Sequence, residues 1–536
     1  MAGIFVLGIC LSLSASAQWI SDLSKNLLVS EEGKTNQDLV CLGETTDGGV
    51  YISWISWEKD NYYLKLQLLD KDGNSRFAPG GIYVCKQPTP TWSSGYGFRV
   101  TKDNNAVFLI TDMRNSEWQA YAYKISPEGE HLWSPEGIAV MKSGEGAALN
   151  PKIMETNAGN YIIGYRSMGA GVSKLSFLKM NTDGTTSWGS KLNIVGAGDL
   201  FDMVPAGNDG FIVSYFENNS YYAQRYNATG EEVWDNRAEI DNTETAKVTS
   251  EPVVVSDGED GLVAGWRYAA SQFTTGGRVL RINAEGESTF SDAFETGNLP
   301  FVSVDPGRKQ IYIFSSDPVA SSVFAPKAWK LDYQGTNLWS SEGVSLSDDG
   351  LSYAAYGIAG CANGDAVCIY RNGSNYNVAT IEYTRISEDG TVTEQNKWVS
   401  SAVGDKGRGG CSTVKNGQII TAWTDMNSTA GGAVFAQNTV VEDPTDNCSL
   451  QSVDSQMVAF VTGREHLFLT ISSSDDTEAF VSLVGLNGEI KEDFGKIVLR
   501  SGKNEMNYQM KGIAAGVYLL TVKTQKEIRT LKVVIR

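Results

Sequence analysis

The sequence predicts an all-β protein, an eight-bladed β-propeller closed by its N-terminal strand and followed by a small Ig-like β-sandwich. Three observations predict this fold. A unit of about fifty residues recurs along most of the chain, as in repeat architectures. Each unit places glycine turns between short apolar segments, and at 536 residues the chain is too long for one hydrophobic core. The repeat ends near Pro444, although strand-like segments continue to the C-terminus.

The first half of the unit is a polar turn followed by a short apolar strand. Asn-Gly and Asp-Gly pairs tolerate the positive φ of tight hairpins, so each turn marks a first strand that leads into a second. Eight such turns are present, at residues 46–49, 103–105, 157–160, 207–210, 258–261, 306–309, 363–364 and 416–417. The apolar segments that follow, from 50–54 to 418–423, are the predicted second strands.

The second half of the unit is a glycine followed four residues later by an aromatic residue. It is clearest at Gly73 with Phe77, Gly129 with Trp133, Gly184 with Trp188, Gly230 with Trp234, Gly286 with Phe290 and Gly335 with Trp339. A third strand ends at the glycine turn, and the aromatic residue opens a fourth. Four short antiparallel strands per unit are typical of a propeller blade. We expect the aromatic residue to lock neighbouring blades together.

The two ends of the repeat region complement each other. Eight first halves face seven second halves, and the seventh is weak because Trp398 is out of register with Gly390. The last unit stops near Ala436, without its glycine turn and fourth strand. The segment 19–29 looks like a fourth strand without its first three. We therefore expect this segment to complete the last blade of a propeller over residues 18–440, which leaves no open sheet edge.

The N-terminus has the pattern of a secretory signal peptide over residues 1–17. An apolar core, Ile4 to Leu13, precedes small residues, and cleavage is expected between Ala17 and Gln18. No basic residue precedes the apolar core, which leaves the true start of the chain open. No other segment approaches the roughly 18 apolar residues of a membrane span, so no transmembrane segment is expected.

After a linker at residues 441–448, the predicted sandwich covers residues 449–536. Its motifs are a glycine turn ending at Gly488, the segment from Gly516 through Tyr518 to Val522, and a basic terminal strand that contains Lys532. In this order they resemble the type A C-terminal sorting domain of the type IX secretion system of Bacteroidetes. The Asn-Pro that often opens such domains is missing.

The resemblance implies that the type IX secretion machinery is a partner, and that the protein is secreted or attached to the outer-membrane surface. Members of this family commonly lose the domain on arrival, and are released or attached to surface lipopolysaccharide. The alternative interpretation of residues 449–536 is an ordinary Ig-like stalk domain.

The blade motif, seen in the segment from Tyr226 to Trp234, is similar to the repeats of quinoprotein-like propellers. Quinoprotein dehydrogenases also carry adjacent cysteines and a calcium site, whereas this chain has no adjacent cysteine pair, so no cofactor is expected. With two histidines and no Cys-x-x-Cys pair, no metal site is expected either. Without the signal peptide six cysteines remain, and the sequence leaves open whether they are thiols or disulfides.

Charge and chemistry narrow the function classes. The net charge is −19 without a Lys/Arg run, so a nucleic-acid partner is not expected. Carboxylates are abundant but fall mostly in repeat turns, where they cap backbone amides, so the catalytic residues, if any, are unknown. The sequence therefore predicts a non-catalytic binding module for a glycan or a protein. The alternatives are a carbohydrate-active hydrolase or lyase with carboxylates or Tyr in the central funnel, and a structural surface-layer component.

Four aromatic residues outside the repeat are the candidate ligand contacts. Trp92 and Tyr96 lie in a loop that joins two blades, and Trp57 and Trp118 lie just beyond predicted second strands. Such aromatics stack on sugars or pack on partner proteins. Packing between blades is the alternative role for each of them.

Overall fold

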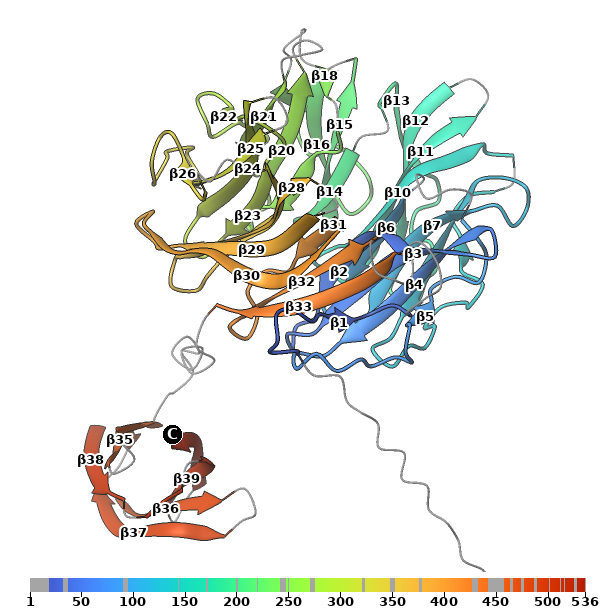
Figure 1. Ribbon diagram of the computed structural model, residues 1–536. Coiled ribbons are helices and arrows are strands. Elements are labelled where there is room, and N and C mark those ends of the chain that lie inside the picture. The colour runs from blue at the N-terminus through green and yellow to red at the C-terminus, as the bar shows by residue number, and fades with distance from the viewer. Residues whose placement is uncertain are drawn as a thin grey trace, which may run out of the picture. The chain divides into compact units, whose positions relative to one another are not determined.

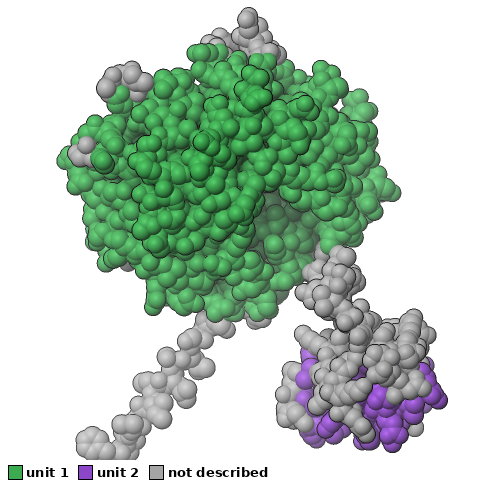
Figure 2. All heavy atoms as spheres, turned by 180° about the vertical axis from the view of Figure 1, so that it is seen from behind, with its two compact units in different colours: residues 1–442 green, residues 443–536 purple. Residues whose placement is uncertain are grey.

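The computed structural model divides into two compact units, residues 1–442 and 443–536, each described here by itself (Figures 1 and 2). The described residues form strands and no helix. They are residues 19–31, 37–89, 95–142, 144–169, 172–198, 201–218, 220–241, 247–248, 250–269, 275–320, 323–347, 352–375, 378–426, 432–441, 457–462, 466–473, 477–485, 489–500, 502–510, 512–514, 516–524 and 528–535.

The first unit consists of antiparallel sheets that we number one to eight in chain order. Sheets one to four contain β2 (Gln37–Glu44), β3 (Val50–Glu58), β4 (Asn61–Leu69) and β5 (Ile82–Tyr83); β6 (Tyr96–Val100), β7 (Ala106–Asp112), β8 (Gln119–Ile125) and β9 (Ile138–Ala139); β10 (Ala147–Glu155), β11 (Tyr161–Gly169), β12 (Val172–Met180) and β13 (Leu192–Val195); and β14 (Phe201–Ala206), β15 (Gly210–Glu217), β16 (Ser220–Tyr226) and β17 (Ala238–Asp241).

The remaining sheets follow the same plan, and in sheet five two short strands share the first position. Sheets five to eight contain β18 (Lys247–Val248), β19 (Val253–Ser256), β20 (Leu262–Ala269), β21 (Thr275–Ile282) and β22 (Phe294–Thr296); β23 (Phe301–Asp305), β24 (Gln310–Ala320), β25 (Val323–Asp332) and β26 (Val344–Ser345); β27 (Ser352–Gly360), β28 (Ala366–Asn375), β29 (Val378–Ile386) and β30 (Val392–Gly404); and β31 (Lys406–Cys411), β32 (Gln418–Asp425), β33 (Ala433–Val440) and β1 (Leu27–Leu28).

The sheets are arranged around a common centre as in a β-propeller (Figure 1). The first strand of each sheet contacts the first strand of the next, from β2 through β6, β10, β14, β19, β23 and β27 to β31, and β31 contacts β2. The second strands are almost wholly buried; every residue of β7 and of β32 is buried. The apolar core therefore lies between neighbouring sheets, and the centre is lined by first strands.

Sheet eight takes its outer strand from the N-terminal part of the chain. Strand β1 pairs antiparallel with β33, with Leu27 opposite Ala436. Beyond the pair, the Val29 N–H donates to the Val434 carbonyl over 2.9 Å, and the Gln437 side-chain amide donates to the Ile20 carbonyl over 2.6 Å. The N-terminal segment that the sequence predicts as a separated fourth strand thus extends sheet eight.

The repeat aromatic of one sheet lies against the turn glycine of the next. The pairs are Trp19 on Gly73, Phe77 on Gly129, Trp133 on Gly184, Trp188 on Gly230, Trp234 on Gly286, Phe290 on Gly335 and Trp339 on Gly390. All seven glycines have φ between +83° and +90°, where a side chain is strained. A Cβ on Gly335 would lie 2.8 Å from the Phe290 ring. We call this contact the aromatic–glycine clamp; it confirms the predicted locking role.

A hydrogen bond accompanies the clamp. In each tryptophan case the indole N–H donates to the carbonyl two residues before the glycine, for example Trp234 to Ala284 over 2.8 Å. Phe290 has no such donor, and the hydroxyl of the preceding Thr289 donates to the equivalent carbonyl, that of Tyr333, over 2.5 Å. The turn presents its carbonyl in a fixed position, so this carbonyl accepts a hydrogen bond from an indole in some sheets and from a hydroxyl in another.

Sheets seven and eight are joined without the clamp. Trp398, the out-of-register aromatic, is 56% exposed. The Ser401 N–H instead donates to the Leu23 carbonyl over 2.8 Å, and the Arg385 guanidinium donates to the Val441 carbonyl. Val441, the first residue of the predicted linker, is buried, and its N–H donates to the Gly417 carbonyl over 2.9 Å.

The second unit has two antiparallel sheets around one apolar core. The strands are β34 (Met457–Thr462), β35 (His466–Ser473) and β38 (Gly502–Gln509) in one sheet, and β37 (Ile490–Leu499), β36 (Thr477–Gly485), β39 (Gly516–Thr524) and β40 (Ile528–Ile535) in the other. Leu469 of the first sheet and Leu520 of the second belong to the same buried cluster.

The residues of the predicted sorting motif are partly described in this unit. Gly516 opens β39, and the Tyr518 hydroxyl donates to the Ala514 carbonyl over 2.9 Å. Lys532 lies opposite Leu519 in the ladder between β39 and β40. Gly488 and the cleavage-site residues, Ala17 and Gln18, lie outside the described residues.

The clamp can be tested at Gly335. We expect Gly335→Ala to cost about 1 to 3 kcal/mol, because the new Cβ meets the Phe290 ring and the backbone has φ of +83°. The measurement is the thermal unfolding midpoint of the full chain. The control is Gly189→Ala, where an added Cβ has no atom within 4 Å. A midpoint that shifts equally little in both variants would contradict a structural role for the clamp.

Candidate functional site

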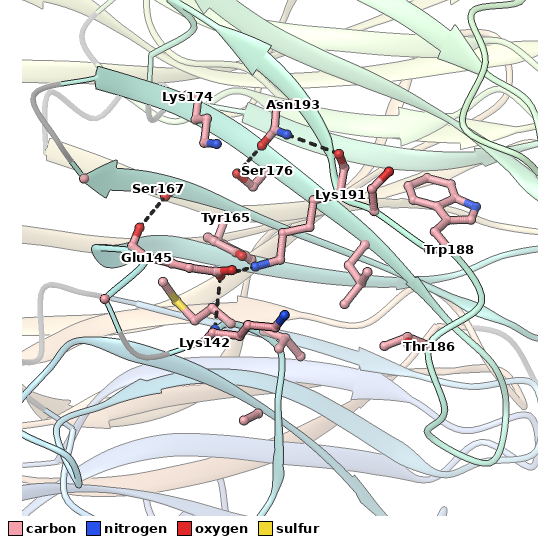
Figure 3. A pocket seen from close by; sticks show the side chains of 18 of the residues that line it. Lys142, Glu145, Tyr165, Ser167, Lys174, Ser176, Thr186, Trp188, Lys191 and Asn193 are labelled. Atoms are coloured by element: carbon pink, nitrogen blue, oxygen red, sulfur yellow. Dashed lines mark hydrogen bonds and ion pairs between the residues drawn. The ribbon is translucent and has the colours of Figure 1, made fainter.

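A surface cleft of about 1050 Å³ lies between sheets two and three (Figure 3). One wall is the chain that follows β9, and the other is made of β11, β12 and β13 with the loop before β13. Its volume is at the upper end of the range for small-molecule sites, but it has more polar residues than such sites usually have. The polar and aromatic lining residues are Lys142, Glu145, Tyr165, Ser167, Lys174, Ser176, Thr186, Trp188, Ser190, Lys191 and Asn193.

The cleft exists because sheet three has a small side chain where its neighbours have large ones. Ser176 of β12 pairs with Tyr165 of β11, and the equivalent residue of β16 in sheet four is Tyr222, opposite Tyr215. The Arg237 guanidinium lies 3.6 Å above the Tyr222 ring and fills that place. Residues at this position in the other sheets with a complete glycine turn are Lys65, Tyr121, Arg278, Lys327 and Glu382.

The clamp holds the loop that forms one wall. Trp188 lies on Gly230 of sheet four, and its indole N–H donates to the Ala228 carbonyl over 3.0 Å. The next residues, Gly189 to Lys191, line the cleft. Because Trp188 is fixed on the neighbouring sheet, the residues that follow it have a defined position before any ligand arrives.

An ion pair between Lys191 and Glu145 crosses the cleft (Figure 3). Burial opposes the charge of Glu145, but hydrogen bonds from Lys191 and from the Lys142 N–H hold the pKa of this carboxyl below its usual range. Burial also opposes the charge of Lys191, yet its bonds to Glu145 and Tyr165 raise the pKa of the ammonium. Burial raises the pKa of Tyr165. At neutral pH the pair is therefore charged and the phenol is neutral.

Hydroxyl and amide groups line the wall above this pair. The Ser176 hydroxyl donates to Asn193 Oδ1 over 2.8 Å, and Asn193 Nδ2 donates to the Lys191 carbonyl over 3.1 Å. Lys174 is half-buried on β12, and Lys142 is exposed after β9. Figure 3 shows these two lysines on opposite sides of the Glu145–Lys191 pair. The described lining thus carries three ammonium groups and one carboxylate.

The predicted ligand contacts do not meet in this cleft. Trp57 stacks edge-on against Tyr62 at 4.4 Å, and the half-buried Trp118 lies just before β8. The Tyr96 hydroxyl donates to the Leu39 carbonyl over 2.9 Å, and burial raises its pKa. Trp92 lies outside the described residues. Their role as ligand contacts stays a prediction.

Sequence reasoning missed the cleft because its charged residues come from separate segments. Lys142, Lys174 and Lys191 belong to different strands or loops and form no local motif. The available signal was the break in the pattern at Ser176, where the aligned repeats have larger side chains.

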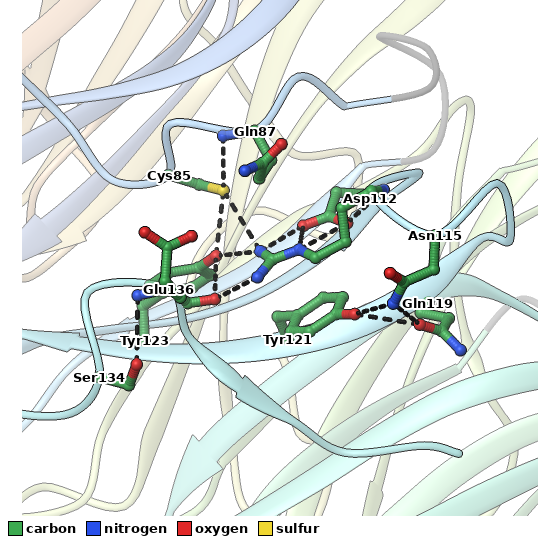
Figure 4. Close-up of polar contacts among 10 residues, drawn as sticks. Cys85, Gln87, Asp112, Asn115, Gln119, Tyr121, Tyr123, Ser134 and Glu136 are labelled. Carbon is green, nitrogen blue, oxygen red and sulfur yellow. Dashed lines mark hydrogen bonds and ion pairs between the residues drawn. The ribbon is translucent and has the colours of Figure 1, made fainter. Parts of the chain in front are cut away.

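A second polar cluster joins sheets one and two (Figure 4). Arg114 donates to Oδ1 of the fully buried Asp112 over 3.1 Å, to its Oδ2 over 2.6 Å, and to the Tyr123 hydroxyl over 2.7 Å. The Tyr123 hydroxyl donates to the Cys85 sulfur over 3.0 Å. Burial raises the pKa of the Cys85 thiol, which keeps it protonated. The Arg114 and Asp112 charges neutralise each other, and the Tyr123–Cys85 bond connects sheet two to sheet one. We call this cluster the Asp112–Arg114 joint.

The centre of the first unit contains two ion pairs between first-strand regions. Arg99 of β6 lies 3.4 Å from Asp202 of β14, and Lys152 of β10 contacts Glu251, just before β19. Each pair joins sheets that are two apart in the ring, so it lies near the axis. A funnel site for hydrolysis would need carboxylates available to a substrate, whereas each of these two is paired with a base.

Where the structure is described, no group of three or more His, Cys, Asp or Glu is placed to hold a metal ion. The same part of the chain contains no helix with the length and apolar character to cross a bilayer. Its cysteines Cys41, Cys85, Cys368 and Cys411 are free thiols.

No protein-family model and no curated protein matches the sequence. Solved structures that the chain resembles include the WD40 domain of SCAP from fission yeast, with 9% identity, 78% of this chain and 95% of that chain covered, and a TM-score of 0.45. The polysaccharide lyase Uly1 has 10% identity, coverage of 77% and 91%, and a TM-score of 0.40. The α-L-arabinofuranosidase Arb93A from Fusarium graminearum has 10% identity, coverage of 78% and 98%, and a TM-score of 0.35. At these scores they assign no function to this chain.

The Asp112–Arg114 joint gives a test of the second cluster. We expect Asp112→Asn to destabilise the first unit by about 3 to 5 kcal/mol, because the Arg114 side chain, 15% exposed, loses its counter-charge. Chemical denaturation followed by circular dichroism measures the loss. The control is Asp72→Asn, whose partner Lys71 is exposed, with an expected change below about 1 kcal/mol. Equal stability of the two variants would contradict a structural role for the joint.

Proposed function

We propose that the protein is a non-catalytic glycan-binding module: an eight-bladed β-propeller closed by β1 that holds its ligand in the cleft between sheets two and three. The observation that carries this proposal is the cleft itself, where hydroxyl, amide and ammonium groups lie beside the half-buried Trp188 side chain. Trp188 supplies the aromatic surface, and Ser190, Asn193 and Lys191 supply polar groups.

Sugars match this combination of groups. Their hydroxyls require both donors and acceptors, which serine, asparagine and lysine side chains provide. Their C–H faces pack against aromatic rings, which supply large contact areas. Asn193 sits on β13, and Ser190 and Lys191 come directly after clamp residue Trp188, so these groups lose little conformational entropy on binding.

A binding role is favoured over hydrolysis by the state of the carboxylate. Hydrolysis of a glycosidic bond usually takes two carboxyl groups, one of them with a raised pKa so that it can act as an acid. Glu145 is the single carboxylate among the described lining residues, and its pKa is lowered by its bonds to Lys191 and the Lys142 N–H. It is better suited to fixing Lys191 than to donating a proton.

The proposal includes export and a surface location. Residues 1–17 act as the signal peptide, and the second unit acts as an Ig-like sorting domain read by type IX secretion machinery. The motif residues Gly516 and Tyr518 lie at the start of one strand of this unit. The unit is compact by itself, which is consistent with a sorting signal that can be cleaved off.

Blocking the cleft tests the binding role. Gly189→Trp places a large side chain where an added Cβ meets no atom within 4 Å, so the fold tolerates it while the cleft is filled. We expect at least a roughly tenfold loss of affinity for a bound polysaccharide, measured by isothermal titration calorimetry. The matched control is Ser340→Trp, at the exposed residue after clamp residue Trp339. Full binding by Gly189→Trp would overturn the assignment of the site.

Removal of the second unit tests the export role. In a bacterium with type IX secretion, the chain without residues 443–536 is expected to stay inside the outer membrane, whereas the full chain reaches the surface or the medium. Cell fractionation with an antibody against the first unit measures the distribution. Surface delivery of the shortened chain would contradict a sorting role.

A further inference from the structure

We propose that the ligand of the cleft is an acidic polysaccharide, with carboxylate or sulfate groups bound by Lys142 and Lys174. This inference rests on the proposed glycan-binding function and adds the charge class of the ligand. It follows from the local charge of the cleft, from which lysines are paired, and from their placement on two walls.

The cleft is positive within an acidic protein. The chain has a net charge of −19, yet the described lining of the cleft has three lysines and one glutamate. At physiological salt the Debye length is about 8 Å, so exposed charges elsewhere on the surface are largely screened from a ligand in the cleft. A bound ligand therefore experiences the lysines more than the overall negative charge.

The lysines differ in their pairing. Lys191 is held by Glu145 and lies 5.6 Å above the Tyr165 ring, so its charge is largely satisfied. Lys142 and Lys174 form no ion pair within the part of the chain that the structure describes. An ammonium group binds an anionic oxygen through charge-assisted hydrogen bonds, which are about twice as strong as neutral ones. These two lysines are therefore the groups that an acidic ligand would satisfy.

The placement of the two lysines fits a chain with more than one acidic group. Lys174 comes from β12 of sheet three, whereas Lys142 comes from the segment after β9 of sheet two. Tyr165 and the Ser176–Asn193 hydrogen bond lie on the wall between them. A sugar ring in the cleft between these walls would thus have acidic substituents available on both sides, as in a polymer of uronic acid or sulfated units.

The experiment compares polymers that differ only in charge. Polygalacturonate and its methyl ester share one backbone, and heparin provides a sulfated probe; each is titrated into the full chain by calorimetry. We expect polygalacturonate or heparin to bind at least about tenfold more tightly than the methyl ester, and its affinity to fall as salt is raised.

Variants assign the effect to the two lysines. Lys142→Gln and Lys174→Gln should each weaken binding of the acidic polymer by about tenfold, and weaken binding of the methyl ester by clearly less. Lys397→Gln removes the same charge from the exposed β30 of sheet seven and should change neither. Glu145→Gln removes the carboxylate and frees Lys191, so it should strengthen binding of the acidic polymer.

The outcomes separate this inference from the proposed function. If the methyl ester binds as tightly as the acid and Gly189→Trp abolishes both, the cleft binds glycans but the acidic class is wrong. If acidic polymers bind equally well to the lysine variants, the assignment to Lys142 and Lys174 is wrong. If none of the probes binds, or if Gly189→Trp leaves binding intact, this inference and the proposed site fall together.

Discussion

The aromatic–glycine clamp is the contact on which the first unit depends. A propeller blade is a four-stranded sheet with two apolar faces, and it is stable only when both faces are covered by neighbours. The clamp sets the spacing of neighbouring sheets, because the turn glycine has no Cβ and lets the ring approach its backbone. A Cβ on Gly286 would lie only 2.7 Å from the Trp234 ring. Burial of such a ring contributes about 1.5 to 3 kcal/mol, and its indole hydrogen bond about 1 kcal/mol more. The contact therefore contributes both to the spacing of neighbouring sheets and to their stability.

The same contact positions the candidate site. Trp188 belongs to sheet three but lies on Gly230 of sheet four, so the loop that starts there is anchored at a second sheet. Lys191 then pairs with Glu145, which precedes β10. The ion pair links the segment that leads into sheet three to the loop before β13. In sheet four the equivalent cation, Arg237, packs on Tyr222 and pairs with Glu217 inside its own sheet. Both sheets thus have a cation three residues after the clamp tryptophan, and they differ in the free space beside Ser176.

The repeat made most of the first unit predictable, because its signals are local. Positive-φ turns and a glycine-to-aromatic spacing are visible in a few residues, and they place the strands and the clamp. The pairing of β1 with β33 followed from counting half-units. Side-chain chemistry between sheets was not visible: the Thr289 hydroxyl that replaces an indole, and the Arg114 that joins Asp112 to Tyr123, depend on which residues meet in space. The cleft was missed for this reason, since its lysines come from two sheets.

Repetition itself explains where function can reside in this fold. Positions that face a neighbouring sheet are constrained by the clamp and by the core, so truncating a side chain there costs stability in proportion to the cavity that it leaves. The position of Ser176 is different, because its equivalents, among them Lys65, Tyr222 and Arg278, share size but not chemistry. A small residue there opens space without disturbing the ladder between β11 and β12, which stays in register from Tyr161 to Gly169. One small residue in one repeat thus leaves a cleft where the next repeat has Arg237 packed on Tyr222, while the surrounding repeats keep the walls of the cleft in place.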